Sequence, residues 1–165
     1  MILFEETLRA LATGGVEFIV IGGVAAAIHG TARNTLDLDV VYDRSPDNVR
    51  RLVAALARHS PYLRGAPPGL PFRWDERTVL AGLNFTLTTG LGNLDVLGEV
   101  AGGDFQSLLP HSEWIEEKDL RFRCVDLPTL IRLKRAAGRP KDFEPIAELE
   151  ALEEEQRRKT ERGAG

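Results

Sequence analysis

An apolar run that ends in two glycines constrains the fold of this chain more than any other feature. Residues 18–21 read Phe-Ile-Val-Ile, and Gly22 and Gly23 follow at once. A continuous apolar run of this length, bounded by glycine, is typical of a strand buried on both faces. The alanine-rich residues 24–29 then predict a short helix. A strand that passes through glycines into a helix leaves free backbone N–H groups where an anion can approach closely.

A second strand is predicted over residues 36–42, where apolar and acidic residues alternate. Residues two apart on a strand point to the same face, so Asp37 and Asp39 lie side by side, about 7 Å apart along the backbone. Two neighbouring carboxylates repel each other, and oxygen ligands of this kind suit Mg²⁺ or Mn²⁺. Taken alone, the pair is more simply a solvent-facing strand. Next to the glycine turn, it predicts a phosphate cradle beside a metal site.

A third acid, Asp95, repeats this pattern in a predicted strand over residues 93–97. It stands between two apolar residues, and a glycine-containing turn joins its strand to another over residues 83–89. Judged alone, Asp95 is an exposed strand residue. As a third ligand, it would complete a two-ion site that stabilises the attacking and leaving oxygens of a phosphoryl displacement.

The remaining pattern predicts an α+β fold, with a small mixed β-sheet and helices packed on it. Helices are expected over residues 1–13, 46–58 and 127–137 and after Asp142, which is interpreted as a helix N-cap. A strand is expected over residues 121–125, and residues 60–76 are expected to form a long ordered loop, with a short strand near 72–74 as the alternative. One domain is predicted over residues 1–155, followed by a charged, frayed tail over residues 156–165.

Charge and cysteine content exclude several classes of protein. Lys and Arg number 21 against 25 Asp and Glu, a net charge of −4, which argues against binding nucleic acid through bulk charge but leaves room for a local basic patch. The single Cys124 excludes an internal disulfide and a cysteine-based zinc site, and it fits a reducing compartment. The apolar runs are too short to span a membrane. We therefore expect a cytoplasmic protein with no membrane partner.

The glycine turn, the Asp-x-Asp strand and the later strand with one acid together resemble the nucleotidyltransferase superfamily with the DNA polymerase β-like palm. The sequence resembles the small prokaryotic members, which are minimal nucleotidyltransferases and the nucleotidyltransferase toxins of toxin–antitoxin pairs. The resemblance covers residues 16–152 and implies that Asp37, Asp39 and Asp95 bind divalent metal, with Asp95 also helping to activate the acceptor hydroxyl. It implies that Gly22 and Gly23 contact the nucleotide phosphates, although many members have serine at the position of Gly23.

Three further residues are candidates for nucleotide binding. Arg33 and Thr35 come just before the acids, and Arg33 is either a partner of a triphosphate or of the acids, or a solvated loop residue. Lys134 lies on the apolar stripe of the predicted helix over residues 127–137, where a lysine must reach water or meet an anion. We expect it to hold phosphate or an acid.

The resemblance implies a metal-dependent enzyme that moves a nucleoside monophosphate from an NTP such as ATP to an acceptor hydroxyl, with release of pyrophosphate. The acceptor is a tRNA, a protein or a small molecule, and a toxin role implies an antitoxin partner. The alternative is a non-catalytic nucleotide-binding or regulatory module of a two-protein system. The presence of all three acids speaks against that alternative.

Overall fold

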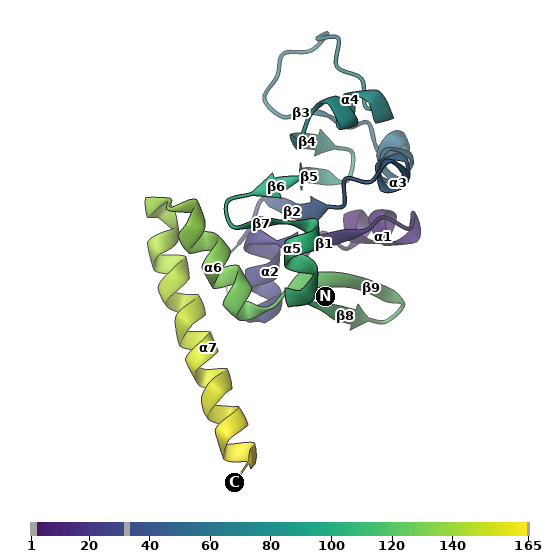
Figure 1. Ribbon diagram of the computed structural model, residues 1–165. Coiled ribbons are helices and arrows are strands. Elements are labelled where there is room, and N and C mark those ends of the chain that lie inside the picture. Colours follow the sequence, from purple (N-terminus) through teal and green to yellow (C-terminus); the bar gives the residue numbers. More distant parts are fainter. Residues whose placement is uncertain (1–2, 32–33, 165) are drawn as a thin grey trace.

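A mixed seven-stranded sheet forms the centre of the protein in a computed structural model, which describes residues 3–31 and 34–164 (Figure 1). Its strands are β1 (Phe18–Ile21), β2 (Asp37–Tyr42), β3 (Tyr62–Leu63), β4 (Asn84–Thr89), β5 (Gly92–Leu97), β8 (Ser112–Glu117) and β9 (Leu120–Val125). They lie in the order β3-β4-β5-β2-β1-β9-β8. Two further strands, β6 (Glu99–Val100) and β7 (Gly103–Asp104), form a separate pair.

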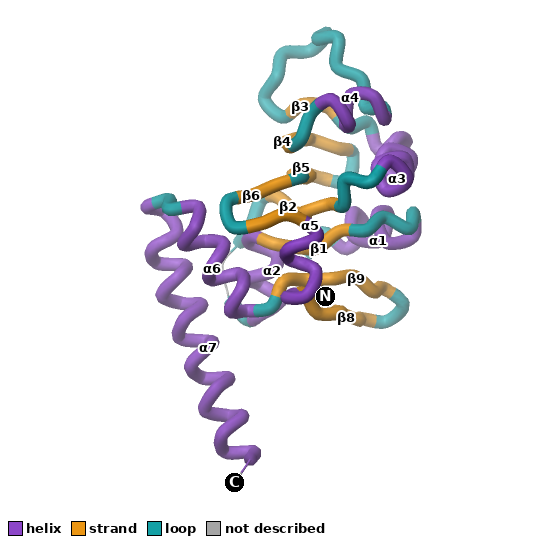
Figure 2. The backbone as a smooth tube through the Cα atoms, in the orientation of Figure 1, coloured by secondary structure: helices purple, strands orange, loops and turns teal. Residues whose placement is uncertain are grey.

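Helices lie on both sides of this sheet (Figure 2). They are α1 (Glu5–Thr13), α2 (Gly22–His29), α3 (Pro46–Leu56), α4 (Glu76–Ala81), α5 (Phe105–Leu108), α6 (Leu127–Ala137) and α7 (Phe143–Ala164). Helices α1 and α3 lie together on one side, α2 and α6 lie on the other, and α7 extends away from the body beyond α6 (Figure 1). The predicted α+β class is therefore confirmed, although the sheet is larger than expected.

The register of the central strands decides where the acids lie. Strand β2 runs antiparallel to β1 and parallel to β5, and Asp39 stands directly between Ile21 and Asp95. Residues directly opposite each other in a sheet share a face, so Asp39 and Asp95 point the same way. The intervening Leu38 and Val40 are fully buried in the core on the opposite face. Because side chains alternate along β2, its core residues and its acids lie on opposite faces of the sheet.

Two helix starts follow from capping residues, as the sequence predicts. The Ser45 hydroxyl accepts a hydrogen bond from the backbone of Asn48, and Pro46 occupies the first turn of α3. The Asp126 carboxylate likewise accepts from the backbone of Thr129 at the start of α6. Both helices bury an apolar stripe, so capping and packing act together.

Several segments differ from the sequence-based expectation. The strand in the proline-rich segment is β3 at Tyr62–Leu63, rather than near 72–74, because it pairs with β4. Strand β8 and helices α4 and α5 were not expected. Helix α7 continues through Ala164, past residue 155; the domain boundary and the frayed tail both stay predictions. Among the helices of residues 3–31 and 34–164, none is both long and apolar enough to cross a bilayer.

Candidate functional site

The three aspartates named by the sequence meet at one point on the sheet. Asp37, Asp39 and Asp95 each place one carboxylate oxygen so that the three oxygens lie within 4.8 Å of one another. Asp37 and Asp39 come from the first half of β2, and Asp95 comes from the middle of the neighbouring strand β5. Their side chains are partly buried, so the charges are only partly screened by water.

Gly22 makes room for this cluster. Its backbone has a φ of 68°, which disfavours residues with a side chain, and a Cβ at this position would lie only 2.1 Å from Oδ2 of Asp39. The helix α2 begins at Gly22 itself, two residues earlier than the sequence suggested. The first turn of α2 therefore lies directly against the acids, where its free N–H groups favour an anion.

Gly23, the second residue of α2, lies close to Thr35 in the segment that precedes β2. A Cβ on Gly23 would lie 2.7 Å from the Thr35 hydroxyl oxygen, so this glycine permits the close approach. That hydroxyl donates a hydrogen bond to the backbone oxygen of Asp37 at 3.0 Å. Thr35 thus supports the start of β2. Arg33, the remaining candidate just before the acids, lies outside the described residues.

Burial and the neighbouring carboxylates disfavour the ionised form of Asp39. Burial, together with the neighbouring charges of Asp95 and Asp37, raises the pKa of Asp39 from 3.8 to about 7, while Lys134 opposes the rise. A group that resists ionisation this strongly is held in place at a cost to the fold. Such a cost is typical of functional sites, where a ligand relieves it.

Arg64 is a site residue that sequence reasoning missed. It follows β3, and its guanidinium donates to Oδ1 of Asp95 at 2.7 Å and lies 3.9 Å from Oδ2 of Asp37. The same Nη2 donates to the backbone oxygen of Leu87 at 2.8 Å, which anchors the side chain to β4. Arg64 neutralises part of the charge on one flank of the cluster. Nothing in the proline-rich sequence around it signals this position.

Lys134 lies on the other flank. Its side chain is largely buried, and its ammonium group stands 3.9 Å from the carboxylate of Asp142. Burial lowers the pKa of Lys134, and Asp142 opposes this. Asp142 also accepts a hydrogen bond from Arg139 at 2.8 Å. It precedes α7 as expected, and its buried carboxylate faces Lys134 on α6 and Arg139 in the turn that follows; its capping role stays a prediction.

A cleft of about 600 Å³ opens between the acids and helix α6. One part of its wall is polar and is formed by Asp39, Asn84, Asp95, Glu99, Lys134 and Arg139, with Gly22 beside Asp39. The other part is apolar and includes Leu97, Leu130 and Leu133. The cleft therefore combines an acidic cluster, two cations and an apolar wall, a combination that suits a small charged ligand with a flat organic group.

The donor set fits a hard divalent cation. It offers three carboxylates and no nitrogen or sulfur ligand, and Mg²⁺ and Mn²⁺ prefer oxygen. A bound cation would also remove the repulsion that raises the pKa of Asp39. Asp37, Asp39 and Asp95 are the residues that would hold it.

Comparison with known proteins identifies a solved structure with a similar fold. No family model matches the chain, and no curated protein sequence matches it. Among solved structures, the chain is similar to that of a protein from Thermotoga maritima provisionally described as a nucleotidyltransferase. The TM-score is 0.54 at 12% identity, and the match covers 88% of this chain and 89% of the other. The chain therefore has a nucleotidyltransferase-like α+β fold, as predicted.

Proposed function

We propose that the protein is a metal-dependent nucleotidyltransferase that moves a nucleoside monophosphate from an NTP to an acceptor hydroxyl. The observation that carries this proposal is the meeting of Asp37, Asp39 and Asp95 within 4.8 Å, directly against the glycine turn that opens α2. The fold likeness supports it, since the neighbouring structure carries a nucleotidyltransferase description.

Each element of the site has a part in this reaction. The first turn of α2 and Lys134 bind the triphosphate, and the apolar wall of the cleft accepts the base. The acceptor oxygen forms a bond to the α-phosphorus, the bond from that phosphorus to the bridging oxygen breaks, and pyrophosphate leaves. Asp95 accepts the hydroxyl proton. Mg²⁺ or Mn²⁺ on the three acids would supply charge stabilisation of the phosphoryl oxygens. Positioning by these groups provides most of the rate.

The proposal leaves three classes of acceptor: a tRNA, a protein and a small molecule. A toxin role with an antitoxin partner belongs to the same proposal, because such toxins transfer nucleotides to cellular acceptors. Non-catalytic nucleotide binding is the competing outcome.

A label-transfer assay distinguishes a nucleotidyltransferase from a protein that only binds nucleotide. The protein is incubated with Mg²⁺, NTPs labelled on the α-phosphate and acceptors of the three classes, and both labelled product and pyrophosphate are measured. We expect transfer with one acceptor class, and a loss of about 10³-fold or more in Asp37→Ala. The matched control is Asp47→Ala, an exposed acid at the start of α3, which should retain transfer. Nucleotide binding without transfer to any acceptor would favour the regulatory module.

A further inference from the structure

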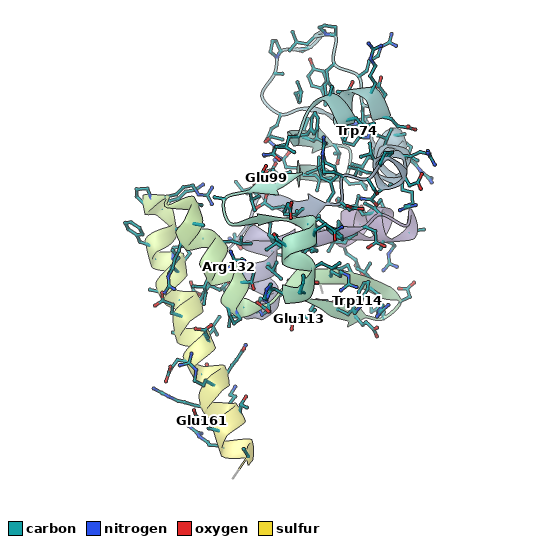
Figure 3. The ribbon with its side chains drawn as sticks, in the orientation of Figure 1. Trp74, Glu99, Glu113, Trp114, Arg132 and Glu161 are labelled. Atoms are coloured by element: carbon teal, nitrogen blue, oxygen red, sulfur yellow. The ribbon has the colours of Figure 1, made fainter. Side chains whose placement is uncertain are left out.

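The cleft beside the acids continues along β5 and ends at a second set of polar side chains. Asp95 and Leu97 lie two residues apart on β5, so both point to the face that carries the acids. Glu99 follows on β6 (Figure 3) and lines the same cleft as the other two. At about 3.3 Å per residue, Glu99 is at most about 13 Å from Asp95 along the chain. A nucleoside whose α-phosphate lies at Asp95 can therefore reach Glu99 with its base.

The part of the cleft between these two acids has apolar walls. Leu97 contributes from the sheet, and Leu130 and Leu133 contribute from α6. A flat ring packs well against aliphatic side chains on both of its faces. Such contacts hold any of the four bases, however, so selection among bases has to come from polar groups at the edge of the ring.

Asn84 offers one such group in a fixed orientation. It lies directly opposite Leu97 in the β4–β5 pair, and it also lines the cleft. Its Oδ1 accepts hydrogen bonds from the backbone N–H groups of Gly98 at 2.8 Å and Glu99 at 3.3 Å. A flipped amide would set its NH₂ group against these two donors, so the orientation is determined. Nδ2 has no hydrogen-bond partner within residues 3–31 and 34–164, and it remains available as a donor to a ligand.

The carboxylate of Glu99 offers two acceptors beside this donor. The side chain is exposed, and among the described residues no cation lies within ion-pair distance of it. Its backbone N–H is held by Asn84, so the two side chains start from adjacent points. An ionised carboxylate only accepts hydrogen bonds, and its two oxygens suit a pair of parallel N–H groups. The end of the cleft thus presents one donor next to two acceptors.

We propose that Asn84 and Glu99 select guanine, so that the nucleotide substrate is GTP. The inference rests on the proposed function, since it names the base of the nucleotide bound there. Guanine presents O6 as an acceptor, followed by N1–H and N2–H as donors. Nδ2 of Asn84 donates to O6, and the carboxylate of Glu99 accepts from N1–H and N2–H.

The other three bases do not match this pattern. Adenine and cytosine place an amino group against the NH₂ of Asn84, and a ring nitrogen without a proton against the carboxylate of Glu99. Uracil offers O4 and N3–H correctly but then sets O2 against a carboxylate oxygen. Buried polar groups that lose their partners in this way discriminate by about 10⁴-fold, but Asn84 and Glu99 are exposed to water. We therefore expect a preference of about tenfold.

The first test compares the affinities of the four bases. Calorimetric titration in Mn²⁺ uses analogues of GTP, ATP, CTP and UTP with a methylene bridge between the α- and β-phosphates, which cannot release pyrophosphate. The guanosine analogue should bind about tenfold more tightly than the other three. In Glu99→Gln this advantage should fall to about twofold or less. Glu161→Gln removes the same charge from the far end of α7 and should retain the full advantage.

The second test dissects the hydrogen bonds. An inosine analogue, which lacks only the 2-amino group of guanosine, should bind with an affinity between those of the guanosine and adenosine analogues. Asn84→Asp keeps an oxygen for the N–H groups of Gly98 and Glu99 but replaces the donor to O6 with an acceptor. The double variant Asn84→Asp/Glu99→Gln therefore presents an acceptor next to a donor and should prefer the adenosine analogue. A reversed preference cannot arise from misfolding, which would weaken the binding of every base.

The outcomes separate this inference from the proposed function. Equal affinity for the four analogues, or an unchanged preference for guanosine in Glu99→Gln, would overturn guanine selection, whereas label transfer by the same protein would leave the proposed function standing. Guanosine-selective binding without transfer to any acceptor would support guanine selection and contradict the transferase. If none of the analogues binds, both fail.

Discussion

Replacing Asp39 by asparagine should stabilise the metal-free protein. The pKa of Asp39 rises from 3.8 to about 7, chiefly through burial and then through the charges of Asp95 and Asp37. Each pKa unit corresponds to about 1.4 kcal/mol, so keeping this carboxylate ionised costs the fold up to about 4 kcal/mol. Asparagine has nearly the same shape and no charge. Because the amide recovers only part of this cost, we expect a gain of about 2 kcal/mol at pH 8.

The pH dependence has a definite sign. Between pH 4 and pH 7, the unfolded Asp39 is ionised while the folded one still binds its proton, so the native state holds more protons and its stability falls as the pH rises. Asparagine abolishes this decline. Because this decline amounts to about 4 kcal/mol, a gain of about 2 kcal/mol at pH 8 means that Asp39→Asn is about 2 kcal/mol less stable than the wild type at pH 4, equals it between pH 5 and pH 6, and keeps a constant advantage above pH 7.

Divalent metal should make the wild type more stable than Asp39→Asn. A cation that binds only the native state at 100 times its dissociation constant adds about 2.7 kcal/mol, and Asp39→Asn loses most of this gain. Thermal and urea unfolding at pH 5 and pH 8, with EDTA or with Mn²⁺, measures both effects. Glu99→Gln, an acid on the same cleft outside the cluster, should change neither (Figure 3). A variant less stable than the wild type at pH 8 in EDTA would refute the reasoning.

Three further perturbations test the packing of the site and core. Gly22→Ala places a Cβ 2.1 Å from Asp39 in a strained backbone conformation, so Mn²⁺ should no longer raise the melting temperature, although far-ultraviolet circular dichroism shows a folded protein. Arg64→Gln removes the cation that pairs with Asp95, and unfolding in EDTA should show a loss of about 1–3 kcal/mol, partly restored by Mn²⁺. Burial raises the pKa of Cys124 to about 12, so a thiol reagent at pH 8 should label it only at the rate of unfolding; rapid labelling of the native protein would contradict its burial.

The sequence predicted the acids because their signal is local. Alternation in β2 places Asp37 and Asp39 on one face and Leu38 on the other, and this needs no knowledge of neighbouring strands. The meeting of Asp95 with them depends on β5 lying parallel to β2, which no local pattern specifies. The local pattern marked Asp95 only as a possible third ligand, and the resemblance to the family then implied that it joins the other two acids. The roles of these residues in metal and nucleotide binding stay predictions.

The place of Arg64 in the site could not be predicted from local sequence patterns. It stands beside a strand of two residues in a segment rich in proline and glycine, and its position is set by pairing with β4, far away in the sequence. Strand β8 was missed for a related reason. An edge strand that exposes half of its residues and fully buries none carries no apolar alternation, so the sequence alone could not place Trp114 beside Arg121 and Arg123.

The flanking cations explain how an acidic cluster can be built before any metal binds. Asp37, Asp39 and Asp95 carry a formal charge of −3, and Arg64 and Lys134 bring the group to −3 + 2 = −1. Arg64 is anchored to Leu87 and Lys134 is held near Asp142, so neither cation is supplied by a mobile side chain. The fold therefore positions the carboxylates by itself and leaves one net negative charge. Under the proposed function, this remaining negative charge would attract a divalent cation, and the two cationic side chains would favour the phosphates that accompany it, so metal and nucleotide would bind to complementary parts of one site.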